Sequence, residues 1–165
     1  MDQVLKYYVT MKKNKSRRNF IKKTAIIGSG IFIVPRHVLG GSGFTPPSDQ
    51  LAVAAVGAGG KGTSDINNAY NNGKNRVVAL CDVDPQNAKK AIQKHSDAKL
   101  YKDYRVMLEK QKDIDAVTIS TPDHTHAVVA HACMIRKLHV YVQKPLTHTI
   151  AEARLLRKVA KENKV

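Results

Sequence analysis

The polar and apolar positions from residue 51 onward alternate between two patterns. Short apolar runs typical of strands are separated by longer segments whose apolar residues recur at helical spacing. The five strand-like runs are Leu51–Val56, Arg76–Cys81, Lys99–Tyr101, Ile114–Ser120 and Leu138–Val142. Four of them are continuously apolar, as expected of parallel strands covered on both faces. We therefore predict an α/β fold with a parallel sheet and crossover helices.

Capping residues mark where the predicted helices begin. A capping side chain or a first-turn proline opens a helix at three places: Asp84-Pro85, Asp103 before Tyr104–Lys110, and Thr121-Pro122 before Asp123–Lys137. Right-handed crossovers then arrange the strands in the order 3-2-1-4-5. This order reverses between the first and fourth strands, and a doubly wound sheet binds ligands at the carboxyl ends there.

The last predicted helix is amphipathic and opens with the capping box Thr149-Ile-Ala-Glu152. Its apolar face is predicted to comprise Ala151, Leu155, Leu156, Val159 and Ala160. Its opposite face carries the basic residues Arg154, Arg157, Lys158, Lys161 and Lys164. We expect the basic face to be a solvated outer surface rather than a phosphate-binding stripe.

A glycine-rich segment, Gly57-Ala58-Gly59-Gly60-Lys61-Gly62, directly follows the first strand. The GxGxxG pattern alone is a weak signal, but between a strand and a helix it is typical of dinucleotide-binding Rossmann folds. Gly57 would make the tight turn, Gly59 would admit a pyrophosphate, and Gly62 would let the helix approach the strand. The helix N-terminus would supply N–H groups and positive potential to the phosphates.

Asp82 ends the second strand, twenty residues past Gly62. A carboxylate at this position accepts hydrogen bonds from the adenosine ribose and repels a 2′-phosphate. Asp84 is available to cap the next helix, so capping does not require Asp82. We predict NAD as the cofactor, with NADP less favoured.

Four stretches of residues 51–165 form a distinctive set: VGAGGKG after the first strand, LCDVD after the second, STPDHTH at Ser120–His126 and VYVQKPLTHTIAEA at Val140–Ala153. Together they resemble the Gfo/Idh/MocA oxidoreductase family. The resemblance implies that Thr121, Pro122 and His126 line the cofactor near its nicotinamide. It implies a substrate-orienting and proton-handling role for Lys144, the predicted catalytic residue. Gln143 stands where the family usually has Glu.

The predicted cofactor site thus combines the glycine-rich loop with residues after the second, fourth and fifth strands. Its members are Gly57, Gly59, Gly60, Lys61, Gly62, Asp82, Thr121, Pro122, His126, Lys144 and Pro145. A family member would continue past Val165 with a sixth strand and a substrate-binding domain. We therefore expect a truncated Rossmann domain, inactive alone, whose fifth strand is an uncovered edge. For the full-length protein the resemblance implies a homo-oligomer.

Three functions remain open at this point. The first is hydride transfer between NAD and a hydroxyl group of a sugar or cyclitol, with Lys144 assisting the proton. The second, found in part of the family, is a glycosidase that uses NAD as an internal redox relay for elimination. The third is a non-catalytic dinucleotide-binding fragment.

The numbers and positions of charged residues, histidines and cysteines bear on three further possibilities: nucleic-acid binding, a metal site and a disulfide. The formal net charge is +15, but nine of the 28 Lys and Arg residues precede residue 51, and no aromatic residues alternate with the rest. Nucleic-acid binding is therefore not predicted. No metal is predicted either, because a common site's spacing and acidic partners are missing around His124, His126, His131, His139 and His148. Cys81 and Cys133 are expected to be buried thiols without a disulfide.

Residues 1–40 resemble an export signal. The segment SRRNFIK at Ser16–Lys22 is close to the twin-arginine motif and precedes the apolar run Thr24–Val34. That run would rise only about 16 Å as a helix, too short for a stable membrane span. We predict passage through the twin-arginine machinery to the periplasm, with cleavage near Gly40 and a linker over residues 41–50. Met11 opens a cleaner signal than Met1, so residues 1–10 are interpreted as an upstream-start artefact.

Overall fold

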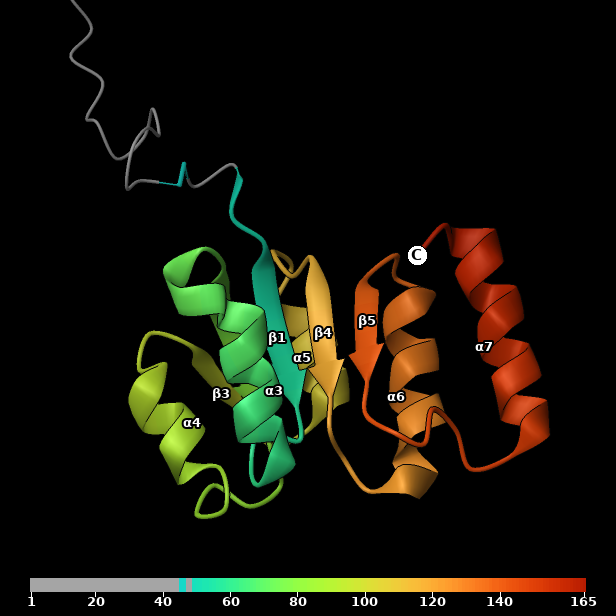
Figure 1. Cartoon of the computed structure of the whole chain (residues 1–165), viewed down its shortest axis with the longest axis horizontal. Coiled ribbons are helices and arrows are strands. Elements are labelled where there is room, and N and C mark those ends of the chain that lie inside the picture. Colours follow the sequence, from blue (N-terminus) through green and yellow to red (C-terminus); the bar gives the residue numbers. More distant parts are fainter. Residues whose placement is uncertain (1–44, 47–48) are drawn as a thin grey trace, which may run out of the picture. The chain divides into compact units, whose positions relative to one another are not determined.

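The computed structural model describes residues 45–46 and 49–165 (Figure 1). The expected export signal and most of the expected linker lie outside these residues. Five parallel strands form one sheet: β1 (Ala52–Val56), β2 (Arg76–Cys81), β3 (Lys99–Tyr101), β4 (Ala116–Ile119) and β5 (His139–Val142). Their order is β3-β2-β1-β4-β5, which confirms the predicted doubly wound topology.

Helices cover the two faces of the sheet. The helical elements are α3 (Lys61–Tyr70), the short 3₁₀ turn η2 (Asn71–Gly73), α4 (Lys89–Lys94), α5 (Tyr104–Lys110), α6 (Asp123–Met134) and α7 (Ile150–Asn163). Helices α3 and α4 pack on one face, α5 and α6 on the other, and α7 lies beside α6 (Figure 1). In the part of the chain that the structure describes, none of the helices has the length and apolar character of a membrane span.

The central strand β1 shows why the sequence folds in layers. All five of its residues are buried, as predicted for a strand covered on both faces. Val53 and Ala55 pack in the cluster under α3 and α4, while Ala54 and Val56 pack in the cluster under α5 and α6. Because successive side chains alternate between faces, one short apolar run contributes to both cores.

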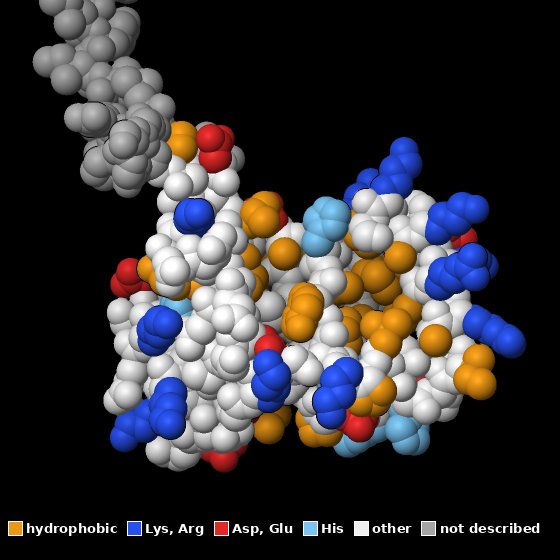
Figure 2. Space-filling model, in the orientation of Figure 1, with side chains coloured by type: hydrophobic (Ala, Val, Ile, Leu, Met, Phe, Trp, Pro, Cys, Tyr) orange, Lys and Arg blue, Asp and Glu red, His pale blue; other side chains and the backbone are white. Residues whose placement is uncertain are grey.

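The edge strand β5 differs from this pattern, and the prediction that it is covered on both faces is wrong. Val140 and Val142 pack against the core shared with α6 and α7, but Tyr141 is 58% exposed. The strand forms the sheet edge, as expected, with β4 as its strand neighbour. Figure 2 shows apolar side chains open to the surface in this part of the molecule.

Two predicted helix limits and one predicted cap need correction. The helix expected at Asp84-Pro85 begins at Lys89, because the Asp84 carboxylate accepts the N–H of Gln86 at 2.9 Å and caps a preceding turn instead. Helix α6 ends at Met134 rather than Lys137, whose φ of 61° lies in the left-handed region. On α6 the expected cap at Thr121-Pro122 makes no side-chain bond.

Helix α7 keeps its predicted capping box, in which Thr149 and Glu152 bond reciprocally. Its buried stripe is narrower than predicted, since Ala151 and Leu155 are exposed while Leu156 and Val159 are buried. Its main packing partner among the described helices is α6, and the side of the stripe that carries Ala151 and Leu155 reaches solvent. The basic face is exposed as expected: Arg154, Arg157, Lys158, Lys161 and Lys164 all reach solvent (Figure 2).

Cys81 and Cys133 are both buried and not disulfide-bonded, as predicted. Burial raises the pKa of each thiol to about 12. Only the thiolate is a strong nucleophile or metal ligand. These cysteines therefore serve as small apolar side chains of the core.

Candidate functional site

A groove of about 500 Å³ opens where the carboxyl ends of β1, β2 and β4 meet. Its walls come from the loops after these strands and from the first turns of α5 and α6. Five of the predicted cofactor residues line it, namely Gly57, Gly59, Asp82, Thr121 and Pro122. The groove thus lies at the reversal of strand order, where a doubly wound sheet binds its ligand.

The glycine-rich turn is held by backbone packing. Gly57 has a φ of 79°, and a Cβ there would lie 2.7 Å from the carbonyl group of Ser120. A Cβ on Gly62 would lie 1.7 Å from the carbonyl oxygen of Gly57. Neither position can carry a side chain without moving backbone, so glycine is required for α3 to approach β1 and β4 this closely.

Asp82 supports the same turn from the end of β2. Its carboxylate accepts the N–H of Gly59 at 2.8 Å and the N–H of Asp84 at 2.9 Å. A carboxylate with two oxygens has capacity for further donors. Asp82 can therefore hold the loop and still accept a ribose hydroxyl group in the groove.

The groove fits a dinucleotide. Thr121 has a buried hydroxyl oxygen without a hydrogen-bond partner among the described residues, and it lies in the groove wall. Such a group is costly unless a ligand or water completes its hydrogen bonding. Gly57 and Gly59 bring backbone into the groove wall and Asp82 adds an acceptor, which are the groups that a pyrophosphate and a ribose require.

The remaining predicted residues lie around this groove rather than in its wall. Gly60 lines a polar hollow between α3 and α4, and Lys61 and Gly62 form the first turn of α3. Lys144 and Pro145 are exposed on the turn after β5. Their contact with a cofactor stays a prediction.

Backbone groups engage both ring nitrogens of His126. The ring is 1% exposed, and its nitrogens lie 2.7 Å from the carbonyl oxygens of Thr121 and Pro145. Both nitrogens are thus engaged by backbone. His126 holds the loop after β4 and the turn after β5 together, whether or not it also approaches a cofactor.

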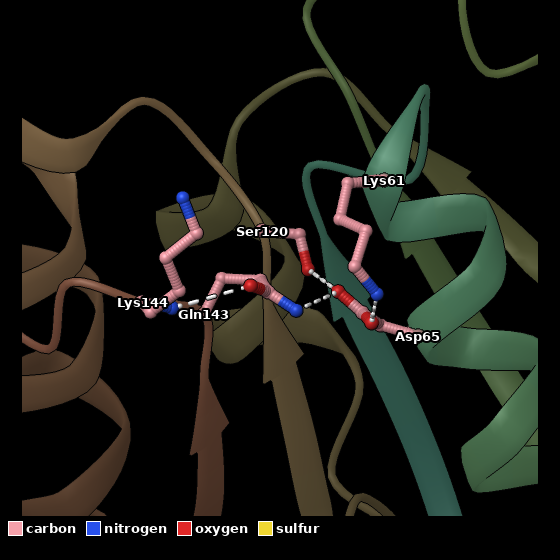
Figure 3. Close-up of polar contacts among 5 residues, drawn as sticks. All are labelled: Lys61, Asp65, Ser120, Gln143 and Lys144. Atoms are coloured by element: carbon pink, nitrogen blue, oxygen red, sulfur yellow. Dashed lines mark hydrogen bonds and ion pairs between the residues drawn. The ribbon is translucent and has the colours of Figure 1, made fainter.

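A buried acid that the sequence analysis missed lies beside the groove. Asp65 of α3 is 5% exposed, and its carboxylate accepts hydrogen bonds from Lys61, from Ser120 at 2.7 Å and from Gln143 at 2.9 Å (Figure 3). Burial alone raises its pKa, but the three hydrogen bonds and the Lys61 charge outweigh burial and bring the pKa below its ordinary value. The i,i+4 spacing to Lys61 was its one sequence signal.

Among residues 45–46 and 49–165, no group of three or more His, Cys, Asp or Glu side chains is arranged to hold a metal ion. Four of the five histidines considered for a metal are partly or fully exposed, and His126 is engaged by backbone.

The glycine turn, the acidic residue ending β2 and the groove at the strand reversal define a dinucleotide-binding domain of the doubly wound class. Residues 51–165 match the family model described as "Oxidoreductase family, NAD-binding Rossmann fold", and the chain belongs to this Gfo/Idh/MocA family. The family model is NAD-binding and the solved structure of the similar protein GenD2 is a complex with NAD, so NAD is the cofactor of this domain.

Similar proteins include enzymes with two different descriptions. The chain is 29% identical over 160 residues to a glycosyl hydrolase family 109 protein of Shewanella pealeana, covering 83% of this chain and 35% of that protein. It is 30% identical over 115 residues to inositol 2-dehydrogenase of Salmonella typhimurium, covering 68% and 34%. The solved structure of GenD2 from gentamicin A biosynthesis, in complex with NAD, superposes with a TM-score of 0.66 at 25% identity, covering 81% of this chain and 36% of GenD2. The chain thus spans about a third of the length of these proteins.

Proposed function

We propose that this domain binds NAD for hydride transfer to or from a hydroxyl-bearing carbon of a sugar or cyclitol. One observation carries the proposal: the Lys144–Pro145 turn is tied to the groove wall. His126 joins Pro145 to Thr121, while Asp65 joins Gln143 to Ser120. Thr121 and Ser120 both line the groove.

The chain's own residues divide the work as follows. Bound NAD would supply the hydride acceptor for oxidation of the substrate carbon. The glycine turn and Asp82 hold the dinucleotide, and Thr121 offers a hydrogen bond inside the groove. Lys144 takes the hydroxyl proton as the carbonyl forms and returns it in the reverse direction. The 30% identity to an inositol 2-dehydrogenase supports a polyhydroxylated substrate.

A second candidate is an NAD-dependent glycosidase. The similarity to the Shewanella pealeana protein covers 83% of the chain. Residues 51–165 make up a smaller share of the chain than this. That match therefore includes residues before the Rossmann domain. A glycosidase of this kind would use the same groove and Lys144, but it would regenerate its cofactor within each turnover.

One assay separates these functions. The protein that carries this chain, at its natural length, is incubated with NAD and a panel of sugars, cyclitols and aryl glycosides. Net NADH formation from a free polyol supports the dehydrogenase, and aryl release without net NADH supports the glycosidase. Tight NAD binding with neither reaction would leave a non-catalytic binding domain.

Lys144 is tested in the same assay. The Lys144→Ala variant is expected to lose about a hundredfold or more in kcat, since general acid–base groups contribute on this scale. Lys158→Ala, on the exposed face of α7, is the matched control. A Lys144→Arg variant with an unchanged pH–rate profile would contradict a proton-transfer role.

We further propose that the protein is exported by the twin-arginine route. The support is the SRRNFIK segment and the apolar run that follows it. The intact mass and N-terminal residue of the protein from its host test this: a mature N-terminus near Gly41 is expected. Replacing Arg17 and Arg18 by Lys should retain the uncleaved protein in the cytoplasm, and continued export of this variant would overturn the proposal.

A further inference from the structure

Asp65 joins three elements that are far apart in sequence. Its carboxylate receives donors from Lys61 on α3, from Ser120 at the end of β4 and from Gln143 at the end of β5 (Figure 3). The Lys61 side chain is 59% exposed, whereas that of Asp65 is 2% exposed. The carboxylate is therefore a buried anchor rather than half of a surface ion pair.

The direction of these hydrogen bonds fixes the Gln143 amide. An ionised carboxylate only accepts, so Gln143 must present its NH₂ group to Asp65. This leaves the amide oxygen of Gln143 to accept the backbone N–H of Lys144, at 3.2 Å. Asp65 thus determines which atom of Gln143 meets the backbone of Lys144.

The same geometry accounts for glutamine at position 143. A glutamate there would place a carboxylate oxygen where the Gln143 amide now donates, 2.9 Å from Asp65. Two carboxylates at that distance cannot both be ionised without strong repulsion. In this chain the negative charge lies on α3, and an amide at the end of β5 connects it to the turn.

We propose that Asp65 is a positioning residue for Lys144, acting through the Gln143 amide to fix the start of the Lys144–Pro145 turn. Its relevance to turnover rests on the proposed role of Lys144, but the coupling itself does not. A simpler alternative is that Asp65 only forms an i,i+4 pair with Lys61 within α3. The positioning role predicts that a substitution of Asp65 changes the hydrogen bonding of the Lys144 backbone, whereas a pair confined to α3 predicts no change there.

Hydrogen exchange of the Lys144 amide, followed by ¹⁵N NMR on the full 165-residue chain, measures the coupling. Asp65→Ala is expected to speed exchange about fivefold, the loss of one ordinary hydrogen bond. Gln143→Ala should have the same effect, and the double variant should add nothing to it. Lys61→Ala, which removes only the ion pair, should leave exchange unchanged. Unchanged exchange in Asp65→Ala, or additive effects in the double variant, would overturn the proposal.

Moving the carboxylate from position 65 to position 143 tests the hydrogen bond between these two side chains. The remaining NMR signals verify that each variant is folded. In Gln143→Glu, protection of the Lys144 amide is expected at low pH, where the two carboxyls share a proton, and is lost as the pH rises and both ionise. Adding Asp65→Asn should restore protection at all pH values, because the Asn amide donates to the new carboxylate. Gln93→Glu, exposed on α4, is the control. Protection independent of pH in Gln143→Glu would contradict the pairing.

Kinetics on the protein of natural length then separate the two proposals. Asp65→Ala should lower kcat without weakening NADH binding, and it should have no further effect in a Gln143→Ala background. If exchange behaves as expected but Lys144→Ala turns over normally, the proposed function fails while the coupling stands. If Lys144→Ala abolishes turnover but Asp65→Ala leaves exchange of the Lys144 amide unchanged, the coupling is wrong and the proposed function stands.

Discussion

The two loops beside the groove are built by different means. The glycine turn after β1 is shaped by backbone in contact with backbone, with Gly62 almost touching the carbonyl of Gly57. The turn after β5 is exposed and is held by side chains from elsewhere, His126 of α6 and Asp65 of α3 with Gln143 between. A short local sequence motif is enough to specify the first loop. The second loop depends on distant residues, such as Asp65, which is 78 positions before Gln143 in the sequence.

This difference predicts how each loop fails. A substitution in the glycine turn introduces a backbone collision, which cannot relax locally and therefore affects folding and cofactor binding together. A substitution among the anchors of the second turn removes bonds to an exposed segment. We expect the latter changes to alter the position of Lys144 while leaving the nucleotide groove in place.

The largest effect is expected for Gly62→Ala. The added Cβ would lie 1.7 Å from the Gly57 carbonyl oxygen, so either α3 or the turn must move. We expect a loss of about 3 kcal/mol or more in unfolding free energy, and no measurable NADH binding. Urea unfolding and NADH fluorescence measure both. Gly73→Ala, outside the groove, is the control: its Cβ would approach only the end of the Tyr70 side chain, at 3.3 Å, its positive φ costs about 1 kcal/mol, and NADH binding should be kept.

His126→Ala should come second. It removes a fully buried ring and its two contacts with Thr121 and Pro145, at a cost of about 3 kcal/mol. If the two loops are built separately, the residual folded protein still binds NADH but loses order at Pro145. Urea unfolding and the NMR signals near Pro145 give the answer. His124→Ala, exposed on the same helix, should be neutral, and an equally large loss there would argue against the clamp.

Asp82→Ala is expected to have a moderate effect. It leaves the Gly59 N–H without its acceptor and removes the carboxylate from the groove, which should weaken NADH binding about tenfold. Titration of NADH fluorescence measures the change. Asp97→Ala, an exposed acid away from this groove, should bind NADH normally. Full NADH affinity in Asp82→Ala would remove Asp82 from the cofactor site.

The smallest effect concerns pH and lies outside both loops. His95 is 7% exposed and contacts Asn67 at 3.0 Å, and burial, with the nearby Lys94 charge, lowers its pKa. The unfolded chain therefore binds this proton more readily, so stability should fall as the pH drops below about 6.5. Thermal unfolding between about pH 7.5 and 5 measures the slope. His95→Gln should reduce it, while His139→Gln, exposed on β5, should not.

The sequence was sufficient for the sheet order and for expecting the glycine turn and Asp82 at the same edge of the sheet, where they line one groove. Strand runs such as Leu51–Val56 and the glycine spacing after them are local signals with a direct physical cause. Helix starts were less certain, because the cap at Asp84 serves a turn ahead of α4. Covering of β5 and of Leu155 on α7 depends on which elements pack there, and periodicity does not carry that information.

Asp65 shows most clearly what local patterns leave out. In the sequence it is one acid in a polar helix, with Lys61 at helical spacing as its obvious partner. Its contacts with Ser120 and Gln143 arise only because Gly62 brings α3 against the end of β4. The departure from Glu at position 143 was visible in the sequence, but its cause was not.

The bond from Gly59 to Asp82 also bears on attempts to change cofactor preference. Asp82 is both the group that would discriminate against a phosphorylated ribose and a structural support of the loop that receives the pyrophosphate. An engineer who replaced it to admit NADP would loosen the loop in the same step. Because one residue provides both the cofactor selectivity and the support of the loop, a change of preference from NAD to NADP would need a second substitution that gives the Gly59 amide a new acceptor.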